Sequence, residues 1–215
     1  GYRSLEWIGA FIESEGIECD YQRCGRFHAA HTPAHFDALV RDTQTLGREE
    51  GVPFEVVSRD DQHAEIGTDA YFGGVVLKQH ASVDPAKYYS GVLDLAKKIG
   101  VAVTDNCPAL DIRREGKAFV VTTPTGDIRA EKIVIATNGY TTSLVPWLQR
   151  RVIPIGTYMI ATDPLPKALM DKLFPTDRVA SDTCKVIYYY RPSPDRSRIL
   201  FGGRVSAAET NPAIC

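Results

Sequence analysis

The sequence lacks the features that mark several large classes of protein. No apolar stretch approaches the ~20 residues that a membrane-spanning helix needs, and no secretory signal pattern is visible. The formal net charge is only −2, so no basic surface of the kind that binds nucleic acid or an anionic membrane is indicated. We therefore expect neither a nucleic-acid partner nor membrane association.

Cysteine is also scarce and irregularly placed. The chain has 5 cysteines with no C-x-x-C spacing: Cys19, Cys24, Cys107, Cys184 and Cys215. An odd number of scattered thiols argues against a disulfide framework and favours the reducing cytoplasm. No Cys–His pattern and no G-x-S-x-G elbow indicates a nucleophilic enzyme.

Glycine-rich phosphate loops are missing as well. Gly73-Gly74 and Gly202-Gly203 occur in or after predicted strands, but neither pair continues as G-x-G-x-x-G or as a P-loop. These glycines are therefore interpreted as sites of close packing or a bulge. A dinucleotide fingerprint is absent from the 215 residues.

Three histidines lie close together in the sequence, but their spacing does not favour a metal site. His28 and His31 are three residues apart on a predicted strand and so point to opposite faces. His35 lies beyond Pro33, on the next predicted helix. Because this pattern matches no common zinc signature, we expect no metal.

The apolar periodicity predicts a mixed α/β chain. The clearest segment has Asp84 as an N-cap, Pro85 as the first helical residue and Gly100 at the end of the helix. Further helices are expected over 3–15, 33–46 and 166–174. Strands are expected near 17–22, 25–31, 54–57, 72–77, 101–103, 108–114, 118–123, 128–130, 132–136, 151–162, 186–191 and 198–202.

One predicted strand ends in an unusual way. Residues 132–136 are apolar and β-branched, and they are followed by Thr137, Asn138 and Gly139. Three small residues at the end of a buried strand allow another group to approach the backbone closely. This turn is therefore a candidate wall of a binding site.

A second candidate is the aromatic and basic segment that begins at Tyr188. On a strand, Tyr188 and Tyr190 share one face, whereas Tyr189 and Arg191 share the other. One face would pack in the core and the other could line a pocket, where phenol hydroxyls would bind a polar ligand. The alternative is that these tyrosines only fill the core.

Three longer segments together resemble one family. They are ASVDPAKYYSGVLDLAKKIGVAV (81–103), GKAFVVTTPTGDIRAEKIVIATNGYTTSLVPWLQRRVIPI (116–155) and YYYRPSPDRSRILFGGR (188–204). In order and spacing they resemble the FAD-dependent D-amino-acid-oxidase-like superfamily. ATNGYT followed by RRVIPIGTYMIAT is similar to the γ-glutamylputrescine oxidoreductase and glycine oxidase-like branch.

The resemblance implies a cofactor and a set of contacts. FAD would lie near Ala109, Thr137, Asn138 and Gly139, because nucleotides sit at the carboxyl ends of parallel strands. The substrate would lie against strands carrying Tyr158, Tyr188, Tyr190 and Arg191. The implied reaction oxidises the C–N bond of a small amine or amino acid, and Arg191 is suited to hold a carboxylate. No residue of the chain is identified as catalytic.

The resemblance also implies a domain arrangement. Residues 84–146 would be part of an FAD-binding domain with a β-meander. Residues 1–83 and 147–215 would form a substrate domain, with a mixed or antiparallel sheet flanked by helices.

The chain starts without Met and lacks the G-x-G-x-x-G unit with which that family begins. We therefore expect the middle fragment of a longer protein, unable to retain FAD alone. Its exposed apolar surface would favour a homodimer. The alternative is a non-catalytic fragment or degenerate paralogue that folds without flavin.

Overall fold

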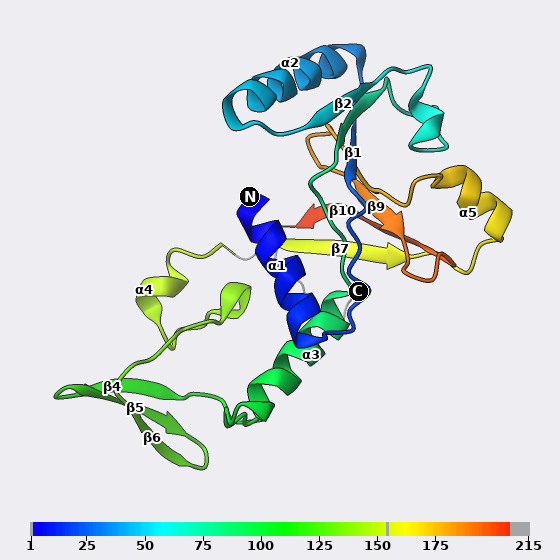
Figure 1. Cartoon of the computed structure of the whole chain (residues 1–215). Helices are drawn as coiled ribbons and strands as arrows, with labels where there is room; N and C mark the ends of the chain where they lie inside the picture. Colours follow the sequence, from blue (N-terminus) through cyan, green and yellow to red (C-terminus); the bar gives the residue numbers. More distant parts are fainter. Residues whose placement is uncertain (1, 154, 207–215) are drawn as a thin grey trace. The chain divides into compact units, whose positions relative to one another are not determined.

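The computed structural model describes residues 2–153 and 155–206 and divides them into two compact units. Unit 1 extends to Ile99 and resumes over Thr157–Val205, whereas unit 2 is built on Gly100–Gly156. Figure 1 traces the chain through both. The predicted mixed α/β architecture is confirmed, with a 7-stranded sheet in addition to a 3-stranded sheet. The division at residues 83/84 and 146/147 into substrate and FAD-binding domains stays a prediction.

The larger sheet has the strand order β2-β3-β1-β8-β9-β10-β7. Its strands are β1 (Arg26–Ala29), β2 (Phe54–Val57), β3 (Gly74–Leu77), β7 (Gly156–Ala161), β8 (Val179–Asp182), β9 (Tyr189–Pro192) and β10 (Ile199–Ser206). β1 pairs with β8 in parallel, and β3, β9 and β10 extend the sheet through antiparallel pairs. The sheet therefore joins segments about 150 residues apart.

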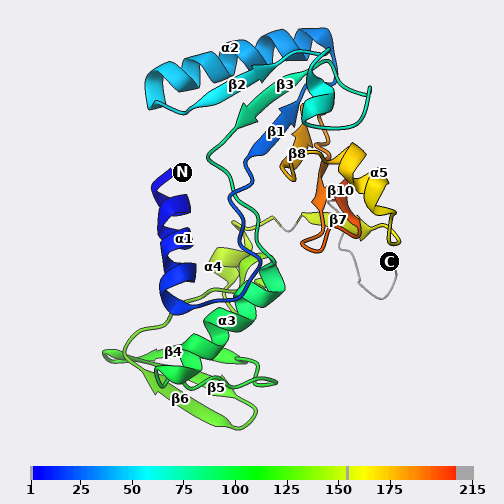
Figure 2. The same cartoon turned by 45° about the vertical axis from the view of Figure 1, so that its right-hand side comes forward.

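Helices cover parts of this sheet. α2 (Pro33–Glu50) lies beside β2 and β3 (Figures 1 and 2), and α5 (Lys167–Leu173) contributes Met170 to the core of the sheet. The side chain of Thr32 caps α2 by accepting a hydrogen bond from the His35 amide, 3.1 Å away. The helix ends at Gly51, whose φ of 66° is a left-handed conformation that favours glycine.

A helix pair forms a second, smaller core in unit 1. The last turn of α1 (Tyr2–Glu15) lies next to the start of α3 (Pro85–Lys98) in Figures 1 and 2. Ile12 of α1, together with Ile17 and Cys19, packs against Tyr88 and Val92 of α3. Tyr88 and Val92 therefore make apolar contacts, although no residue of α3 is fully buried.

One face of the larger sheet carries the main core. Phe27, Val76 and Met170 are completely buried, and Ala180 and Phe174 pack beside them. These residues come from three strands and from α5, together with the residue that follows it. We call this side of the sheet the core face.

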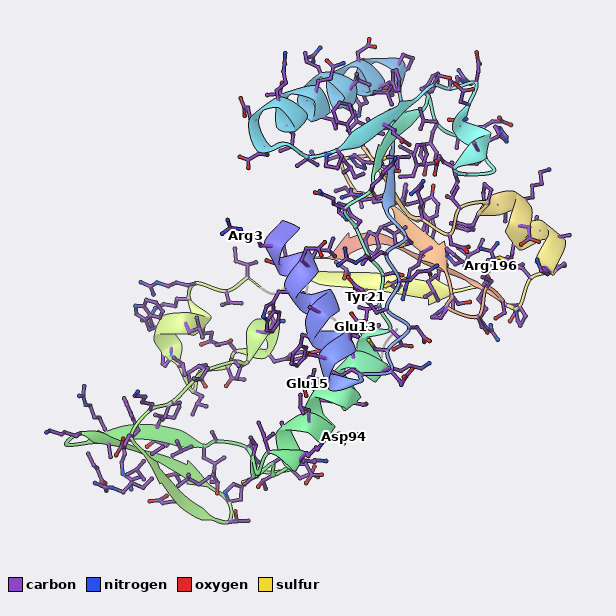
Figure 3. The ribbon with its side chains drawn as sticks, in the orientation of Figure 1. Arg3, Glu13, Glu15, Tyr21, Asp94 and Arg196 are labelled. Atoms are coloured by element: carbon purple, nitrogen blue, oxygen red, sulfur yellow. The ribbon has the colours of Figure 1, made fainter. Side chains whose placement is uncertain are left out.

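Charged side chains lie on the outer elements. Figure 3 places Arg3, Glu13 and Glu15 along α1 and Asp94 on α3. Arg196, also labelled there, joins the β9–β10 loop to α5 by donating to Asp171 Oδ1 at 3.0 Å and to the Phe174 carbonyl at 3.2 Å. This loop is therefore held in place by a neighbouring helix.

Unit 2 contains an antiparallel meander. Its elements are β4 (Asp111–Glu115), β5 (Ala118–Thr123), β6 (Gly126–Ala130), the short 3₁₀ turn η2 (Asn138–Tyr140) and α4 (Pro146–Gln149). Pairs from Phe119↔Ala130 to Thr123↔Gly126 join the predicted strands 118–123 and 128–130 into a hairpin, whose second strand begins earlier, at Gly126. Arg113, on the neighbouring strand β4, supports the hairpin by donating hydrogen bonds to Thr122 and Asp127.

Several predicted strands are wrong. Residues 132–136 and 101–103 form no strand, and Val134 is 87% exposed. An apolar run becomes a strand only when a neighbour pairs with it, and none pairs with these segments in the described part of the chain. Residues 17–22 contribute a single bridge, from Gln22 to Ser82. Other strands are shifted or shorter: β4 starts at Asp111 and β7 spans Gly156–Ala161.

Within residues 2–153 and 155–206, no helix combines the length and the apolar character needed to cross a membrane.

The core face gives a first prediction. Replacing Phe27 by Ala removes a fully buried ring, so we expect the free energy of unfolding to fall by about 3–5 kcal/mol. Tyr89→Ala is the matched control, because Tyr89 is 66% exposed. Urea unfolding followed by fluorescence measures both, and equal effects would contradict the assignment of the core.

The N-cap of α3 gives a second prediction. The Asp84 carboxylate accepts hydrogen bonds from the amides of Ala86 (2.9 Å) and Lys87 (3.0 Å). The bond from the Lys87 amide is the main reason why the pKa of Asp84 lies below its usual value. Asp84→Ala should lower the melting temperature and speed hydrogen exchange in the first turn of α3.

Asp84→Asn is the control for this change. It keeps an oxygen that can accept both amide hydrogen bonds, so it should retain most of the stability. If Asn were as damaging as Ala, the carboxylate would act through its charge rather than as a cap.

Candidate active site

The side of the larger sheet opposite the core face carries polar residues. Phe27 and Ala180 are paired in register and point into the core, so their neighbours Arg26, His28 and Ser181 point to the other side. We call this side the pocket face. Its polar side chains thus follow from the strand alternation.

Two rows of residues run across this face. Arg26 pairs with Val179, and Arg191 pairs with Leu200. Because Ala180 pairs with Tyr190 in the antiparallel β8–β9 ladder, Val179 lies opposite Arg191 and joins these pairs into one row. The second row contains His28, Ser181, Tyr189 and Gly202.

A pocket of about 390 Å³ opens on this face, inside unit 1. Its apolar lining includes Met159, Val179, Ile187 and Leu200, and its polar lining includes Arg26, Ser181, Tyr189 and Arg191. An apolar wall with a few converging polar groups is the usual composition of a small-molecule site.

Arg26 is held by two neutral partners. Its Nε donates to Ser181 Oγ at 2.8 Å, and its Nη2 donates to His28 Nδ1 at 3.2 Å. Within the described residues, no carboxylate forms an ion pair with Arg26. The guanidinium is thus oriented but not neutralised.

His28 can accept the hydrogen bond from Arg26 only as a neutral imidazole. A guanidinium can only donate, so Nδ1 accepts and the ring proton is on Nε2. Burial lowers the pKa of His28, and the charge of Arg26 lowers it further. The Ser181 hydroxyl is also 2.8 Å from Nδ1, which completes a three-residue network.

Arg191 and Tyr189 lie next to each other on the same face. Nη2 of Arg191 donates to the Val83 carbonyl at 3.0 Å, and no carboxylate in the described chain pairs with this guanidinium. The Tyr189 ring lies over Gly202, where an added Cβ would be 2.2 Å from Tyr189 Cε2. Gly202 therefore leaves the space that the phenol occupies.

The structure separates the tyrosines predicted to contact substrate. Tyr190 borders the pocket, but its hydroxyl donates to Tyr71 at 2.9 Å and its ring packs with Phe174 and Phe201 on the core side. Burial is the main reason why the pKa of Tyr190 is raised. Tyr188 precedes β9, is 43% exposed and lies 5.5 Å from the Phe201 ring.

Tyr158, the third of these tyrosines, lies on β7 directly before the pocket residue Met159. Successive residues of a strand point to opposite faces, so Tyr158 lies on the other side from Met159. Of the residues predicted from the sequence, Arg191 and Tyr190 thus border the pocket. Whether any of them contacts substrate stays a prediction.

Tyr189, Arg26 and Ser181 were not among the predicted site residues. The alternation from Tyr188 to Arg191 already placed Tyr189 beside Arg191, so this signal was present. Arg26 and Ser181 are 155 positions apart, and only the β1–β8 pairing brings them together.

The residues predicted to face the cofactor all belong to unit 2. Thr137, Asn138 and Gly139 are exposed around η2, where Asn138 has a φ of 47° and Thr137 Oγ1 lies 2.8 Å from Thr141 Oγ1. A Cβ on Gly139 would meet no atom within 4 Å. Ala109 is half-buried just before β4. The turn is therefore open to a close approach, and the cofactor role stays a prediction.

The other histidines of the sequence cluster bind Thr183. Nδ1 of His31 and Nδ1 of His35 lie 2.9 and 3.0 Å from its Oγ1, and the two rings meet edge to face. In the residues that the structure describes, no group of three or more His, Cys, Asp or Glu side chains could hold a metal ion.

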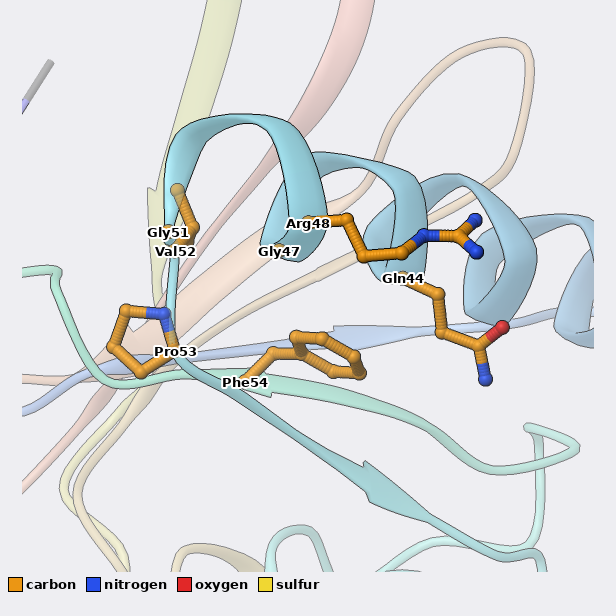
Figure 4. Close-up of a pocket in the computed structure, with 7 residues that line it drawn as sticks. All are labelled: Gln44, Gly47, Arg48, Gly51, Val52, Pro53 and Phe54. Atoms are coloured by element: carbon orange, nitrogen blue, oxygen red, sulfur yellow. The ribbon is translucent and has the colours of Figure 1, made fainter.

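A second hollow, of about 510 Å³, lies between the end of α2 and the start of β2 (Figure 4). Phe54 lies under Gly47 there, and a Cβ on Gly47 would be 2.8 Å from the Phe54 ring. Arg48, labelled beside them, donates to Thr45 in its own helix at 3.3 Å. This hollow is at the surface and contains one charged side chain, so it offers less for recognition than the pocket on the sheet.

Curated proteins of known sequence are similar to this chain over most of its length. The chain is 24% identical to the probable oxidoreductase OrdL of Haemophilus influenzae, with 98% of this chain and 50% of the relative covered. It is 27% identical to γ-glutamylputrescine oxidoreductase of Escherichia coli, with 96% and 48% covered. The chain thus spans about half the length of the curated relatives it matches.

Solved structures share the fold. Glycine oxidase from Geobacillus kaustophilus matches with a TM-score of 0.79 at 18% identity, covering 97% of this chain and 56% of that one. L-proline dehydrogenase from P. horikoshii matches with a TM-score of 0.77 at 15% identity, with the same coverage.

The family match extends over almost the whole sequence. Residues 1–214 match the family DAO, described as FAD dependent oxidoreductase. The chain belongs to this family of FAD-dependent oxidoreductases.

Proposed function

We propose that the chain is part of an enzyme that oxidises the C–N bond of a small amine or amino acid with FAD. The observation that carries the proposal is the pocket face, where Arg191 and Arg26 border a largely apolar pocket and have no carboxylate partner in the described residues. Such a pocket suits a ligand with an anionic group and an apolar part.

The residues of the chain partly fit the cofactor. Thr137, Asn138, Gly139 and Ala109 would hold part of FAD, because the turn is exposed and Gly139 leaves open space around its Cα. Bound FAD would supply a two-electron acceptor for the hydride from the carbon that bears the amine. Loss of this hydride and of the nitrogen proton gives an imine, which water hydrolyses to a carbonyl compound and ammonia or a smaller amine.

The side chains of the pocket would bind and orient the substrate. Arg191 would hold a substrate carboxylate through the N–H groups that Val83 leaves free. The Tyr189 hydroxyl would add a hydrogen bond from the same face, with the ring fixed over Gly202. Val179 and Leu200 would keep water from the reacting carbon.

Two alternatives concern the whole protein. The absence of G-x-G-x-x-G from the sequence favours a non-catalytic chain that folds without flavin. The second alternative is a dehydrogenase that passes electrons to a carrier instead of oxygen. The similar structures include both a glycine oxidase and an L-proline dehydrogenase, so the fold does not separate the two.

The remaining proposals concern the cellular location of the protein, its partners and its oligomeric state. On its charge and cysteine usage we propose a cytoplasmic protein whose partner is the small-molecule substrate, with neither nucleic acid nor a membrane as partner. Trp147, Tyr140 and Ile153 are among the exposed apolar residues of unit 2, and such residues favour a homodimer.

The cofactor proposal is tested by colour. We expect the 215-residue chain alone to stay colourless after incubation with FAD and gel filtration, since it has no phosphate-binding glycine loop. The full reading frame should carry the visible flavin spectrum. Stoichiometric flavin on the 215-residue chain would contradict the first expectation, and a full-length protein that stays colourless would overturn the enzyme proposal.

Arg191 gives a kinetic prediction for the full-length enzyme. Arg191→Gln should raise KM for a carboxylate-bearing amine by about 10- to 150-fold, the range for a hydrogen bond to a charged group. KM for a comparable neutral amine should change little. Arg41→Gln is the control, because Arg41 is exposed and belongs to α2. Equal losses for both substrates would exclude carboxylate binding by Arg191.

A further inference from the structure

Arg26 differs from two other partly buried arginines of unit 1, which have carboxylate partners. Arg178 pairs with Glu65 at 2.6 Å, and Arg196 pairs with Asp171 at 3.0 Å. Arg26 is partly buried as well, yet its two hydrogen-bond partners are a hydroxyl and a neutral imidazole. A partly buried cation without a counter-ion is costly, and an anion in the pocket would remove that cost.

The two neutral partners of Arg26 also fix the orientation of its guanidinium. Ser181 and His28 occupy Nε and Nη2 of Arg26, so they fix the plane of the guanidinium while leaving its charge unscreened. In the described part of the chain, the N–H groups of Nη1 and the second N–H group of Nη2 have no partner, so the Nη1–Nη2 edge of the guanidinium is free. A preoriented fork of this kind matches the geometry of a carboxylate.

The position of Arg26 relative to Arg191 defines what would fit. The two residues are in the same row of the pocket face, with Val179 between them on β8. Two strand spacings separate their backbones by roughly 10 Å. A ligand that reaches both guanidinium groups is best matched by two anionic groups, joined by a segment that lies over the apolar side chain of Val179.

We infer that Arg26 and Arg191 form a two-point anion clamp across β8, which selects an amine carrying two carboxylates. Arg26 is then a specificity residue that adds to the carboxylate contact of Arg191. The inference rests on the proposed function for the identity of the substrate as an amine, but binding of the two anionic groups is testable without turnover.

The first experiment measures binding to the full 215-residue chain. The probes are glutarate, which has two carboxylates, and butyrate, which has one. We expect glutarate to bind at least about 10-fold more tightly by calorimetry, and the difference to shrink as salt increases. Similar affinities for the two probes would overturn the clamp without the need for any variant.

The second experiment assigns the effect to Arg26. In Arg26→Gln the affinity for glutarate should fall about 10-fold, to that of butyrate, whereas the affinity for butyrate should not change. Arg26→Lys should lie between wild type and Arg26→Gln, because it keeps the charge but loses the fork. Arg41→Gln should behave as wild type. Circular dichroism identifies a variant that fails to fold, and an unchanged glutarate-to-butyrate ratio in either folded Arg26 variant would overturn the role of Arg26.

Turnover by the full-length flavoprotein separates this inference from the proposed function. If amines are oxidised but Arg26→Gln leaves the preference for iminodiacetate over sarcosine unchanged, the clamp fails and the proposed function stands. If no amine is oxidised while glutarate binding still depends on Arg26, the clamp stands and the proposed function fails.

Discussion

The parallel pairing of β1 with β8 is the interaction on which the larger unit depends. It aligns Phe27 with Ala180 and His28 with Ser181, although these residues are more than 150 positions apart in the chain. The first pair enters the core and the second lies on the pocket face. A shift of one residue in this register would exchange the two faces, burying a guanidinium and exposing a phenyl ring. The hydrophobic core and the polar site are therefore fixed by the same register.

Electrostatics distinguishes two partly buried arginines of this unit, Arg178 and Arg26. Arg178, whose side chain is only 21% exposed, is neutralised by Glu65. This ion pair ties the loop that contains Glu65 to the start of β8. Arg26 is oriented by neutral groups and keeps its charge available to the pocket. The first arrangement contributes to stability, whereas the second leaves an unbalanced charge where a ligand can approach. An unpaired cation in a partly apolar pocket is in this respect more informative than an ion pair.

Local rules predicted the elements whose stability is local. The α3 helix has its cap at Asp84 and its first residue at Pro85, and the β5–β6 hairpin has a tight turn at Pro124-Thr125, so each could be read from the sequence. β8 was missed because Val179–Asp182 is short and half polar, and it becomes a strand through pairing on both sides. The strand predicted at residues 132–136 was wrong for the opposite reason. Its sequence favours a strand, but no segment of the described chain pairs with it.

The site was predicted to a lesser extent because it depends on which face of a strand is buried. Alternation along β9 correctly divided Tyr188 and Tyr190 from Tyr189 and Arg191, but it does not state which pair faces the core. That choice is made by Phe174 and Tyr71, which meet Tyr190 from distant parts of the chain. With Tyr190 in the core, its neighbours must face the pocket, where Gly202 gives room for the ring of Tyr189. The binding surface thus follows from a packing contact on the opposite side of the sheet.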